Sequence, residues 1–193
     1  MRLKRTASDW LRAKLRLVAG LLAIVLVYVL AALGIAVMIE RASAASALGC
    51  ASPDPRAVPV VSLSRGEIRD LAALAWAEAR GEPDPYCAMQ AVAAVVVNRV
   101  RTNPRYFGAT ITQVISRPYA FSPFGRDDPQ HRRMQSVDER DGLYVSALLA
   151  ALAALSGADP TRGGTHFHAV GARPAWANDM LVTAKIGSHI FYK

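Results

Sequence analysis

A chain of 193 residues has room for one compact domain and short accessory segments, and its net charge of +8 is unevenly distributed. Residues 1–16 hold six basic residues and one acidic residue, so this segment alone supplies +5 and everything after it only +3. The later sequence has no basic stripe interleaved with aromatic residues, which excludes nucleic acid as the expected partner, whereas a mildly positive domain suits an anionic polymer.

Residues 17–39 form an uninterrupted apolar run of 23 residues without a charged side chain. As a helix this run would be about 35 Å long, enough to cross a bilayer core of about 30 Å. The positive-inside rule keeps residues 1–16 as a cytoplasmic tail, so we expect a single-pass protein of the cytoplasmic (inner) membrane with its domain on the periplasmic or extracellular side. A cleaved signal peptide is the alternative, although its apolar core usually spans about 7–15 residues.

Residues 40–63 are rich in Ala, Ser and Pro and lack an amphipathic period, which predicts a semi-extended linker. Cys50 lies in this linker, and the one other cysteine, Cys87, lies in the following domain. In an oxidising compartment the two can pair and tie the linker to the domain. Two unrelated thiols are the alternative.

The working domain is predicted over 64–193, and its first half reads as two helices. Ser64 and Glu67 match the capping box, which predicts a helix over 65–80. Gly81 and Pro83 end that helix, and Asp84 followed by Pro85 begins a second one over 86–101. This second helix is apolar on nearly every side, as expected of a central buried helix.

The second half of the domain predicts two more helices and a small β element. A short helix is expected over 110–116, a long polar loop over 117–137, and a third long helix over 138–155 with Leu148, Leu152 and Leu155 on its inner face. Alternation over 165–170 and a Gly187-Ser188 turn between two β-type runs predict a hairpin. The expected fold class is mainly α (α+β): a compact helical domain with a small β-hairpin or sheet near its C-terminus.

Glu78 is the most informative polar residue. It follows Leu71 by seven residues and Leu74 by four, which places it on or beside the apolar face of the 65–80 helix. Partly apolar surroundings favour the protonated carboxyl group that a general acid requires. The alternative is a helix-end glutamate paired with Arg80 or Arg99. Glu82 lies past Gly81, where the helical register is lost, so we expect it to cap the next helix or to form an ion pair.

Five ordered motifs resemble a known family. They are AEARGEP at 77–83, QAVAAVVVNR at 90–99, AFSP at 120–123, ALSGADP at 154–160 and IGSHIFY at 186–192. Over about residues 67–193 the chain resembles the bacterial cell wall hydrolase family typified by the spore cortex-lytic enzymes. The resemblance implies a compact lysozyme-like helical fold, peptidoglycan as the partner, and cleavage of its glycan between N-acetylmuramic acid and N-acetylglucosamine.

The same resemblance implies a role for Glu78. Members of the family are described as lytic transglycosylases with a single catalytic glutamate, the first of the EARGE motif, which is Glu78 in this sequence. No cofactor is implied. A hydrolytic muramidase is the nearest alternative and would need a second carboxylate across the sugar. The candidates for it are Asp127, Asp128, Asp138 and Glu139.

Further site residues are expected around this glutamate. Aromatic faces pack on pyranose rings and hydroxyl or imidazole groups bond to sugars, so the expected substrate contacts are Tyr119, Phe121, Ser122, Phe124, Trp176 and His168. Loop aromatics that simply cover the core are the alternative. A supporting shell that fixes the structure or orients the acid is expected from Arg80, Glu82, Asn98, Arg99 and His189.

The histidines allow a different reaction class. His166 and His168 would lie on one face of a strand, and with His189 they can form a zinc site such as a wall amidase or peptidase would need. No HExxH or similar set accompanies them, so the sequence predicts no metal. The family strand usually carries Tyr, Phe and Asn here, so the substrate contacts of this chain are expected to differ. A non-catalytic wall-binding module with an inert Glu78 is the last alternative.

Overall fold

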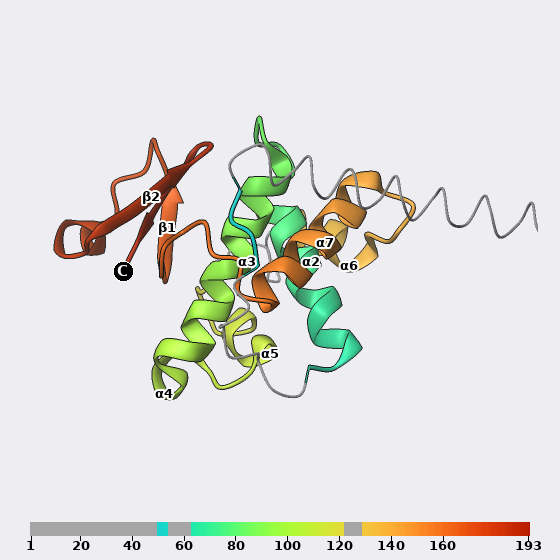
Figure 1. The fold of residues 1–193 in the computed structure, drawn as a ribbon, viewed down its shortest axis with the longest axis horizontal. Coiled ribbons are helices and arrows are strands. Elements are labelled where there is room, and N and C mark those ends of the chain that lie inside the picture. The colour runs from blue at the N-terminus through green and yellow to red at the C-terminus, as the bar shows by residue number, and fades with distance from the viewer. Residues whose placement is uncertain (1–49, 54–62, 122–128) are drawn as a thin grey trace, which may run out of the picture. The chain divides into compact units, whose positions relative to one another are not determined.

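The structure, a computed structural model, describes residues 50–53, 63–121 and 129–193, all within one compact unit, Ala45–Lys193. Helices form most of its regular secondary structure, and a small sheet lies at one side of them (Figure 1). The helices are α2 (Arg65–Ala79), α3 (Pro85–Thr102), α4 (Pro104–Phe107), α5 (Ile111–Ile115), α6 (Pro129–Ser136), α7 (Gly142–Leu155) and the 3-10 helix η2 (Ala175–Asp179). The strands are β1 (His166–Ala169), β2 (Val182–Ile186) and β3 (His189–Tyr192). The mainly helical fold with a minor β element is confirmed.

The predicted membrane segments cannot be compared with this structure. Among the described residues, no helix has both the length and the apolar character that crossing a bilayer requires. The predicted tail at 1–16, the predicted span at 17–39 and most of the predicted linker at 40–63 lie outside the described residues. These assignments therefore stay predictions.

Helix α2 begins where the capping box predicts. The Ser64 hydroxyl accepts a hydrogen bond from the Glu67 amide at 3.1 Å, and the Glu67 carboxylate accepts one from the Ser64 amide at 3.1 Å. Two donors that the helix end would otherwise leave unpaired are thus satisfied. Beyond the first turn nearly every residue is buried, because α2 packs against both α3 and α7.

Helix α3 is the central element of the domain. Asp84 caps it by accepting a hydrogen bond from the Cys87 amide at 3.1 Å, and Pro85 occupies the first turn, as predicted. Every residue from Cys87 to Arg99 is buried. One side of α3 packs on α2 and α7, while Ala91 and Val95 pack against Phe191 of the sheet, which places α3 between the two layers (Figure 1).

Two helix assignments from the sequence need correction. The stretch predicted as a polar loop, 117–137, contains α6, whose residues are almost all polar and present only Met134 to the core. So few apolar positions leave no helical period to detect. The third long helix begins at Gly142 rather than at 138, because the Asp141 carboxylate caps it through the amides of Leu143 at 2.8 Å and Tyr144 at 3.3 Å.

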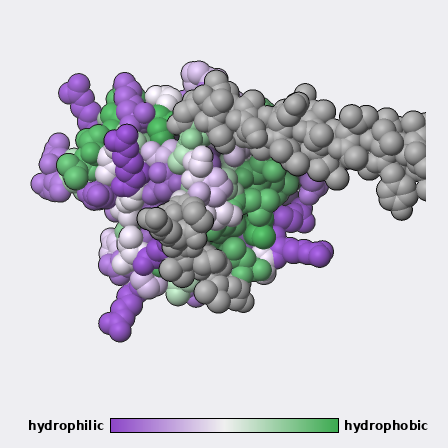
Figure 2. All heavy atoms as spheres, viewed as in Figure 1, coloured by the Kyte–Doolittle hydropathy of each residue, from purple (hydrophilic) through white to green (hydrophobic). Residues whose placement is uncertain are grey.

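The inner face of α7 also differs from the prediction. Leu152 is 46% exposed, Leu148 is half-buried, and only Leu155 of the three predicted leucines is buried. Because α7 is apolar on every side, its sequence does not reveal which face is inside. The small side chains allow close approach to α2 and α3, and the buried residues are Tyr144, Ala147, Ala150, Ala151, Ala154 and Leu155. The outer leucines contribute to the apolar surface over α7 in Figure 2.

The three strands form an antiparallel sheet in the order β1-β3-β2, and the predicted Gly187-Ser188 turn joins β2 to β3. His166 pairs with Tyr192, and Phe167 pairs with Phe191. Since directly opposed residues share a face of a sheet, His166, His168 and Tyr192 lie on one face. Phe167, His189 and Phe191 lie on the other, which packs against α3.

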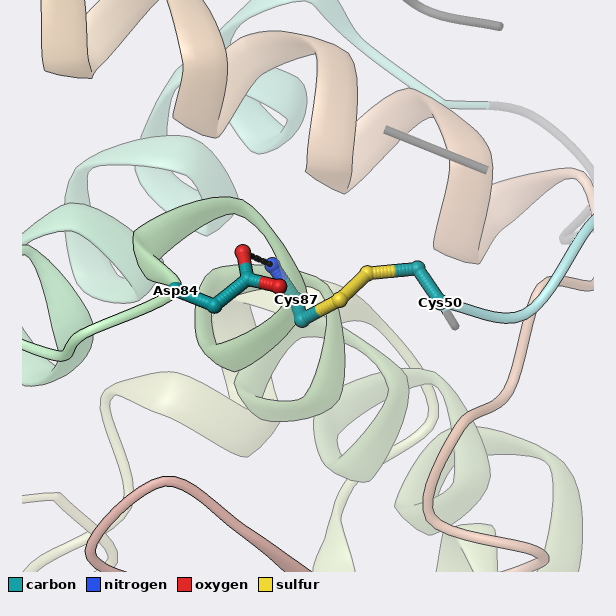
Figure 3. A group of neighbouring side chains, drawn as sticks. All are labelled: Cys50, Asp84 and Cys87. Carbon is teal, nitrogen blue, oxygen red and sulfur yellow. Dashed lines mark hydrogen bonds between the residues drawn. A yellow bond between two sulfur atoms is a disulfide. The ribbon is translucent and has the colours of Figure 1, made fainter. Parts of the chain in front are cut away.

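Cys50 and Cys87 form a disulfide, which decides between the two alternatives left open by the sequence (Figure 3). The bridge joins the described segment 50–53 to the first turn of α3. A second link lies beside it, because the side-chain amide of Gln90 donates a hydrogen bond to the carbonyl oxygen of Ala51 at 3.1 Å. The described part of the predicted linker is therefore fastened to the central helix at two points.

Candidate active site

Glu78 lies in the last turn of α2 and is half-buried. Its immediate neighbours Ala77 and Ala79 are buried, and one turn earlier Leu74 and Ala75 are inaccessible to solvent. The side chain therefore stands at the border between the apolar core and the surface, as its spacing from Leu71 and Leu74 predicts. A carboxyl group at such a border can reach a substrate while part of its surroundings stays apolar.

Arg80 fixes the end of the helix that carries Glu78. Its guanidinium donates hydrogen bonds to the Ala77 carbonyl at 2.9 Å and to the side-chain oxygen of Gln130 at 2.7 Å. The same group lies 4.2 Å from the centre of the Trp76 ring, within the range of a cation–π contact. Arg80 thereby ties the C-terminus of α2 to α6, consistent with a supporting role.

Glu82 contacts the turn between β2 and β3, far away in the sequence. Its carboxylate accepts hydrogen bonds from the Ser188 amide at 2.8 Å and from the Ser188 hydroxyl, and it lies 3.5 Å from Nδ1 of His189. The partner that the sequence left open is therefore His189, and the contact is an ion pair only while this imidazole is protonated. The cap of the next helix, the other expectation for Glu82, is supplied by Asp84 instead.

Gly187 is required by this contact for two reasons. Its φ of +57° lies in the left-handed region, which side chains with a Cβ adopt at a cost. A Cβ at this position would also collide with the carboxylate of Glu82. The glycine thus lets the turn approach the segment after α2 closely enough for Ser188 to bind Glu82.

Both ionisable groups of this contact are shifted so that the folded state favours the unprotonated forms. Burial raises the pKa of Glu82. The Ser188 hydroxyl and amide together with His189 lower it by more than burial raises it, so the net shift is downward from 4.5. Burial lowers the pKa of His189 below 6.5, against a smaller opposing effect of Glu82. The unfolded chain consequently takes up protons first as the pH falls, and folding stability declines with acidification.

We expect the free energy of unfolding to fall as the pH drops below 6.5, where unfolded His189 becomes protonated, and to fall further below about 4.5, where unfolded Glu82 does. Urea titrations at stepped pH measure this slope. His189→Gln should reduce the slope between pH 6.5 and 5 without abolishing it, because burial, aided by Arg99, also lowers the pKa of His166. An unchanged slope in that variant would contradict the assignment.

Asn98 and Arg99, at the end of α3, hold the connection between α7 and β1. The Asn98 side-chain amide donates to the Asp159 carboxylate and the Gly164 carbonyl, both at 3.0 Å, and Arg99 Nε donates to the Thr165 carbonyl at 2.7 Å. These bonds fix where β1 starts. These contacts are consistent with a structural role for both residues, and their role in orienting Glu78 stays a prediction.

A cavity of about 280 Å³ gathers several of the predicted residues. Tyr119 is fully exposed at its rim and Trp176 is 37% exposed, while the buried Arg99 also lines the cavity. His168 stands next to it, 5.7 Å from the Trp176 ring and 5.2 Å from the Tyr192 ring by ring centres, with its Nε2 at 2.8 Å from the Tyr192 hydroxyl. Three residues predicted as sugar contacts thus lie in one region.

The remaining predicted contacts are placed differently. Phe121 is buried, with 5% of its surface exposed, and packs under the Arg99 guanidinium and beside Phe167, which matches the alternative that a loop aromatic covers the core. Ser122 and Phe124 lie outside the described residues.

Sequence reasoning missed several residues of the same cavity. Tyr106, Phe107 and Arg117 line it, and so does His166, which the sequence suggested only as a zinc ligand. One available signal was the pair of aromatics after Asn103-Pro104, a helix start too short to bury either ring fully. Only the fold shows that this segment meets β1 and η2.

The geometry of the histidines argues against the zinc alternative. His166 and His168 lie on the same face of β1, as predicted, but His189 lies on the opposite face and contacts Phe167 and Phe191. The three imidazoles therefore do not converge on one point. Within the described residues the one group with metal-like spacing is Cys50, Asp84 and Cys87 (Figure 3), whose sulfur atoms are joined in the disulfide.

Two of the candidates for a second carboxylate can be located. Asp138 bonds to Arg140, whose side-chain and backbone donors lower the pKa of this carboxyl group to about 2. Glu139 is exposed next to it. Asp127 and Asp128 lie outside the described residues.

The family of the chain follows from comparison with known proteins. The model of the cell wall hydrolase family matches residues 83–192, more than half of the chain. The chain belongs to the cell wall hydrolase family. The match begins immediately after Glu82, so neither glutamate of the EARGE motif lies inside it.

Curated relatives in this family are longer than this chain. A spore cortex-lytic enzyme of Halalkalibacterium halodurans is 34% identical over 129 residues, which cover 66% of this chain and 35% of that protein. One from Bacillus cereus is 33% identical over 136 residues, 67% of this chain and 45% of the relative. The chain therefore spans less than half the length of these relatives. Both alignments are longer than the segment that follows Glu82, so they extend into the sequence before it.

This chain covers nearly the whole length of two solved catalytic domains. The catalytic domain of the Bacillus cereus SleB protein has 31% identity and a TM-score of 0.56, covering 69% of this chain and 94% of that domain. The catalytic domain of the germination-specific lytic transglycosylase SleB from Bacillus anthracis has 34% identity and a TM-score of 0.56, covering 70% and 100%. The family cell wall hydrolase fold, predicted from the five motifs, is confirmed.

Proposed function

We propose that this cell wall hydrolase cleaves the peptidoglycan glycan strand between N-acetylmuramic acid and N-acetylglucosamine, as a lytic transglycosylase in which Glu78 is the general acid and base. The observation that carries the proposal is that the chain covers the whole of a solved catalytic domain named a lytic transglycosylase. The position of Glu78 at the border of the core supports it, because an acid there can be partly desolvated and still reach a substrate.

The proposed reaction needs only one carboxyl group. Protonated Glu78 donates its proton to the glycosidic oxygen while positive charge develops at the anomeric carbon of muramic acid, and the N-acetylglucosamine leaves as an alcohol. The resulting carboxylate then takes the proton of the 6-hydroxyl group of the same muramic acid. That oxygen attacks the anomeric carbon and closes a 1,6-anhydro ring, which returns Glu78 to its protonated form.

The surroundings of Glu82 support the choice of Glu78 as the acid. Glu82 receives two hydrogen bonds from Ser188 and lies beside His189, and its lowered pKa keeps it ionised at neutral pH. A group held ionised is a poor proton donor. Asp138 is likewise held ionised by Arg140, and its side chain is engaged there rather than in a sugar-binding cleft.

We further propose that residues 17–39 anchor the protein in the cytoplasmic membrane, with residues 1–16 in the cytoplasm and the domain outside. The Cys50–Cys87 disulfide supports an oxidising location for the domain. The anchor is tested by treating spheroplasts, intact and lysed, with protease. We expect protease to degrade the domain in both samples. Without protease, the protein should be recovered in the carbonate-washed membrane fraction, and its recovery in the soluble fraction would contradict the anchor.

The reaction is tested by incubating the full-length chain with purified sacculi and identifying the products by mass spectrometry. Anhydro-muropeptides are the expected products. Muropeptides with a reducing muramic acid would instead show hydrolysis, and free stem peptides would contradict both glycosidase reactions. A parallel incubation with EDTA should give the same products, since Glu78 chemistry needs no metal ion.

A further inference from the structure

The 280 Å³ cavity beside β1 combines features that the proposed reaction does not use. It lies where the end of α3 meets α4, the segment 117–120, β1 and η2. Its volume is near the lower limit of small-molecule sites, about 300 Å³, which suits one sugar ring or a side group of it. The residues that line it are Arg99, Tyr106, Phe107, Arg117, Pro118, Tyr119, Ala120, His166, Phe167 and Trp176.

The residues that line the cavity include two arginines and no acidic residue. Arg99 is buried, with its guanidinium 4.8 Å from the centre of the Phe121 ring and 5.3 Å from that of Phe107, and Arg117 is exposed at the rim. None of the ten lining residues, all of them described, is acidic. Two arginines therefore line one small cavity without a lining carboxylate to balance their charge.

The positions of both arginines are fixed by contacts. Arg99 Nε donates to the Thr165 carbonyl at 2.7 Å, and the Arg117 guanidinium donates to the Tyr106 carbonyl and lies 5.0 Å from the centre of the Tyr106 ring. Burial lowers the pKa of Arg99 to about 10. Tyr106 opposes this shift and the charge of Arg117 adds to it, and at this pKa the guanidinium is still charged at neutral pH. An anion in the cavity would relieve the repulsion between the two cations.

Aromatic side chains complete the walls. Tyr119 is fully exposed and holds a φ of +63°, an unfavourable backbone conformation for a non-glycine residue. Trp176 packs against His166 at 5.3 Å between ring centres and keeps part of its surface open to solvent. Apolar faces beside guanidinium donors match a ligand that has both a pyranose ring and an acidic group.

We propose that this cavity is a carboxylate-binding subsite, in which Arg117 and Arg99 bind an acidic group attached to N-acetylmuramic acid while the aromatic walls contact its sugar ring. The proposal rests on the proposed function for its substrate class. The carboxylate has two sources in peptidoglycan: the lactyl group of a muramic acid that lacks a stem peptide, and the acidic groups of the stem peptide itself. Arginine suits either, because its planar donors bind a carboxylate in pairs.

The test measures binding of small ligands to the full-length chain by calorimetry. N-acetylglucosaminyl-N-acetylmuramic acid is suitable because its muramic acid is the last sugar. It therefore lacks the bond from the anomeric carbon of muramic acid to a following N-acetylglucosamine, which is the bond that the enzyme is proposed to cut. It is compared with the same disaccharide carrying a lactyl carboxamide, and the disaccharide–peptide is compared with its fully amidated form. The acid should bind about tenfold or more tightly than the amide in at least one pair, and the pair that shows it identifies the source.

Arg117→Gln should abolish that preference, because it removes an exposed charge at the rim without emptying the core. Arg65→Gln is the matched control: it removes one exposed arginine at the first residue of α2, outside the cavity, and should leave the preference intact. Circular dichroism of both variants verifies the fold. Equal binding of acid and amide by the unmodified chain, or an undiminished preference in Arg117→Gln, would overturn the proposal.

The two proposals fail in different ways. Release of anhydro-muropeptides from sacculi together with equal binding of acid and amide would overturn the subsite and leave the reaction standing. No release from sacculi together with no binding of any disaccharide would overturn both. A preference for the acid without release would support the subsite and count against the reaction.

Discussion

Replacing Glu78 by glutamine should lower the rate of release of anhydro-muropeptides from sacculi by about 10²–10⁴-fold, the range that a general acid or base contributes. Glutamine keeps the size and the hydrogen-bonding shape of the side chain but cannot donate the proton that the glycosidic oxygen needs. The initial rate of product release, followed by mass spectrometry, measures the loss. Binding of the uncleavable disaccharide should change little, because the carboxyl proton is needed in the transition state.

Glu67→Gln is the matched control for this variant. It makes the same chemical change on the same helix, and glutamine also serves at this position of a capping box, so both the fold and the activity should be retained. Glu82→Gln should weaken the contact with Ser188 and His189 and lower stability, while the folded protein still cleaves glycan. Loss of activity in Glu82→Gln with full activity in Glu78→Gln would show that the acid has been assigned to the wrong glutamate.

What the sequence predicts well in this protein depends on neighbours along the chain. Ser64 and Glu67 form the capping box three residues apart, and Asp84 with Pro85 begins α3 in the same local way. The exclusion of Glu82 from the apolar face also follows locally, from the glycine before it. The partner of Glu82 cannot be predicted from neighbouring residues, since Ser188 lies 106 residues later and only the fold brings the two together.

The same limit explains the errors and omissions. The inner face of α7 could not be identified because every face of this helix is apolar. Helix α6 was missed for the opposite reason, because almost all of its residues are polar. The cavity with Arg99 and Arg117 combines separate stretches of the chain whose spacing carries no common period. Arg99 itself was predicted as a supporting residue, but its place in a cationic cavity depends on Phe107 and Phe121 packing around it.

Removing the disulfide should cost about 3–4 kcal/mol of unfolding free energy. The bridge joins residues separated by 37 positions, and loop-closure entropy for a loop of that length gives a stabilisation of this size, because the cross-link restricts mainly the unfolded chain. Cys50→Ser and Cys87→Ser should each show the loss as a lower urea midpoint under oxidising conditions, with little change in the rate of glycan cleavage by the folded protein.

The same experiment distinguishes the bridge from the packing around it. Cys50→Ser leaves Cys87 buried in the first turn of α3, so a loss caused by the bridge should be the same in either single variant and no larger in the double variant. Reductant should lower the urea midpoint of the unmodified chain to that of the variants and leave theirs unchanged. A midpoint in Cys50→Ser equal to that of the oxidised chain would mean that the Gln90–Ala51 hydrogen bond and the surrounding contacts hold the segment without the bridge.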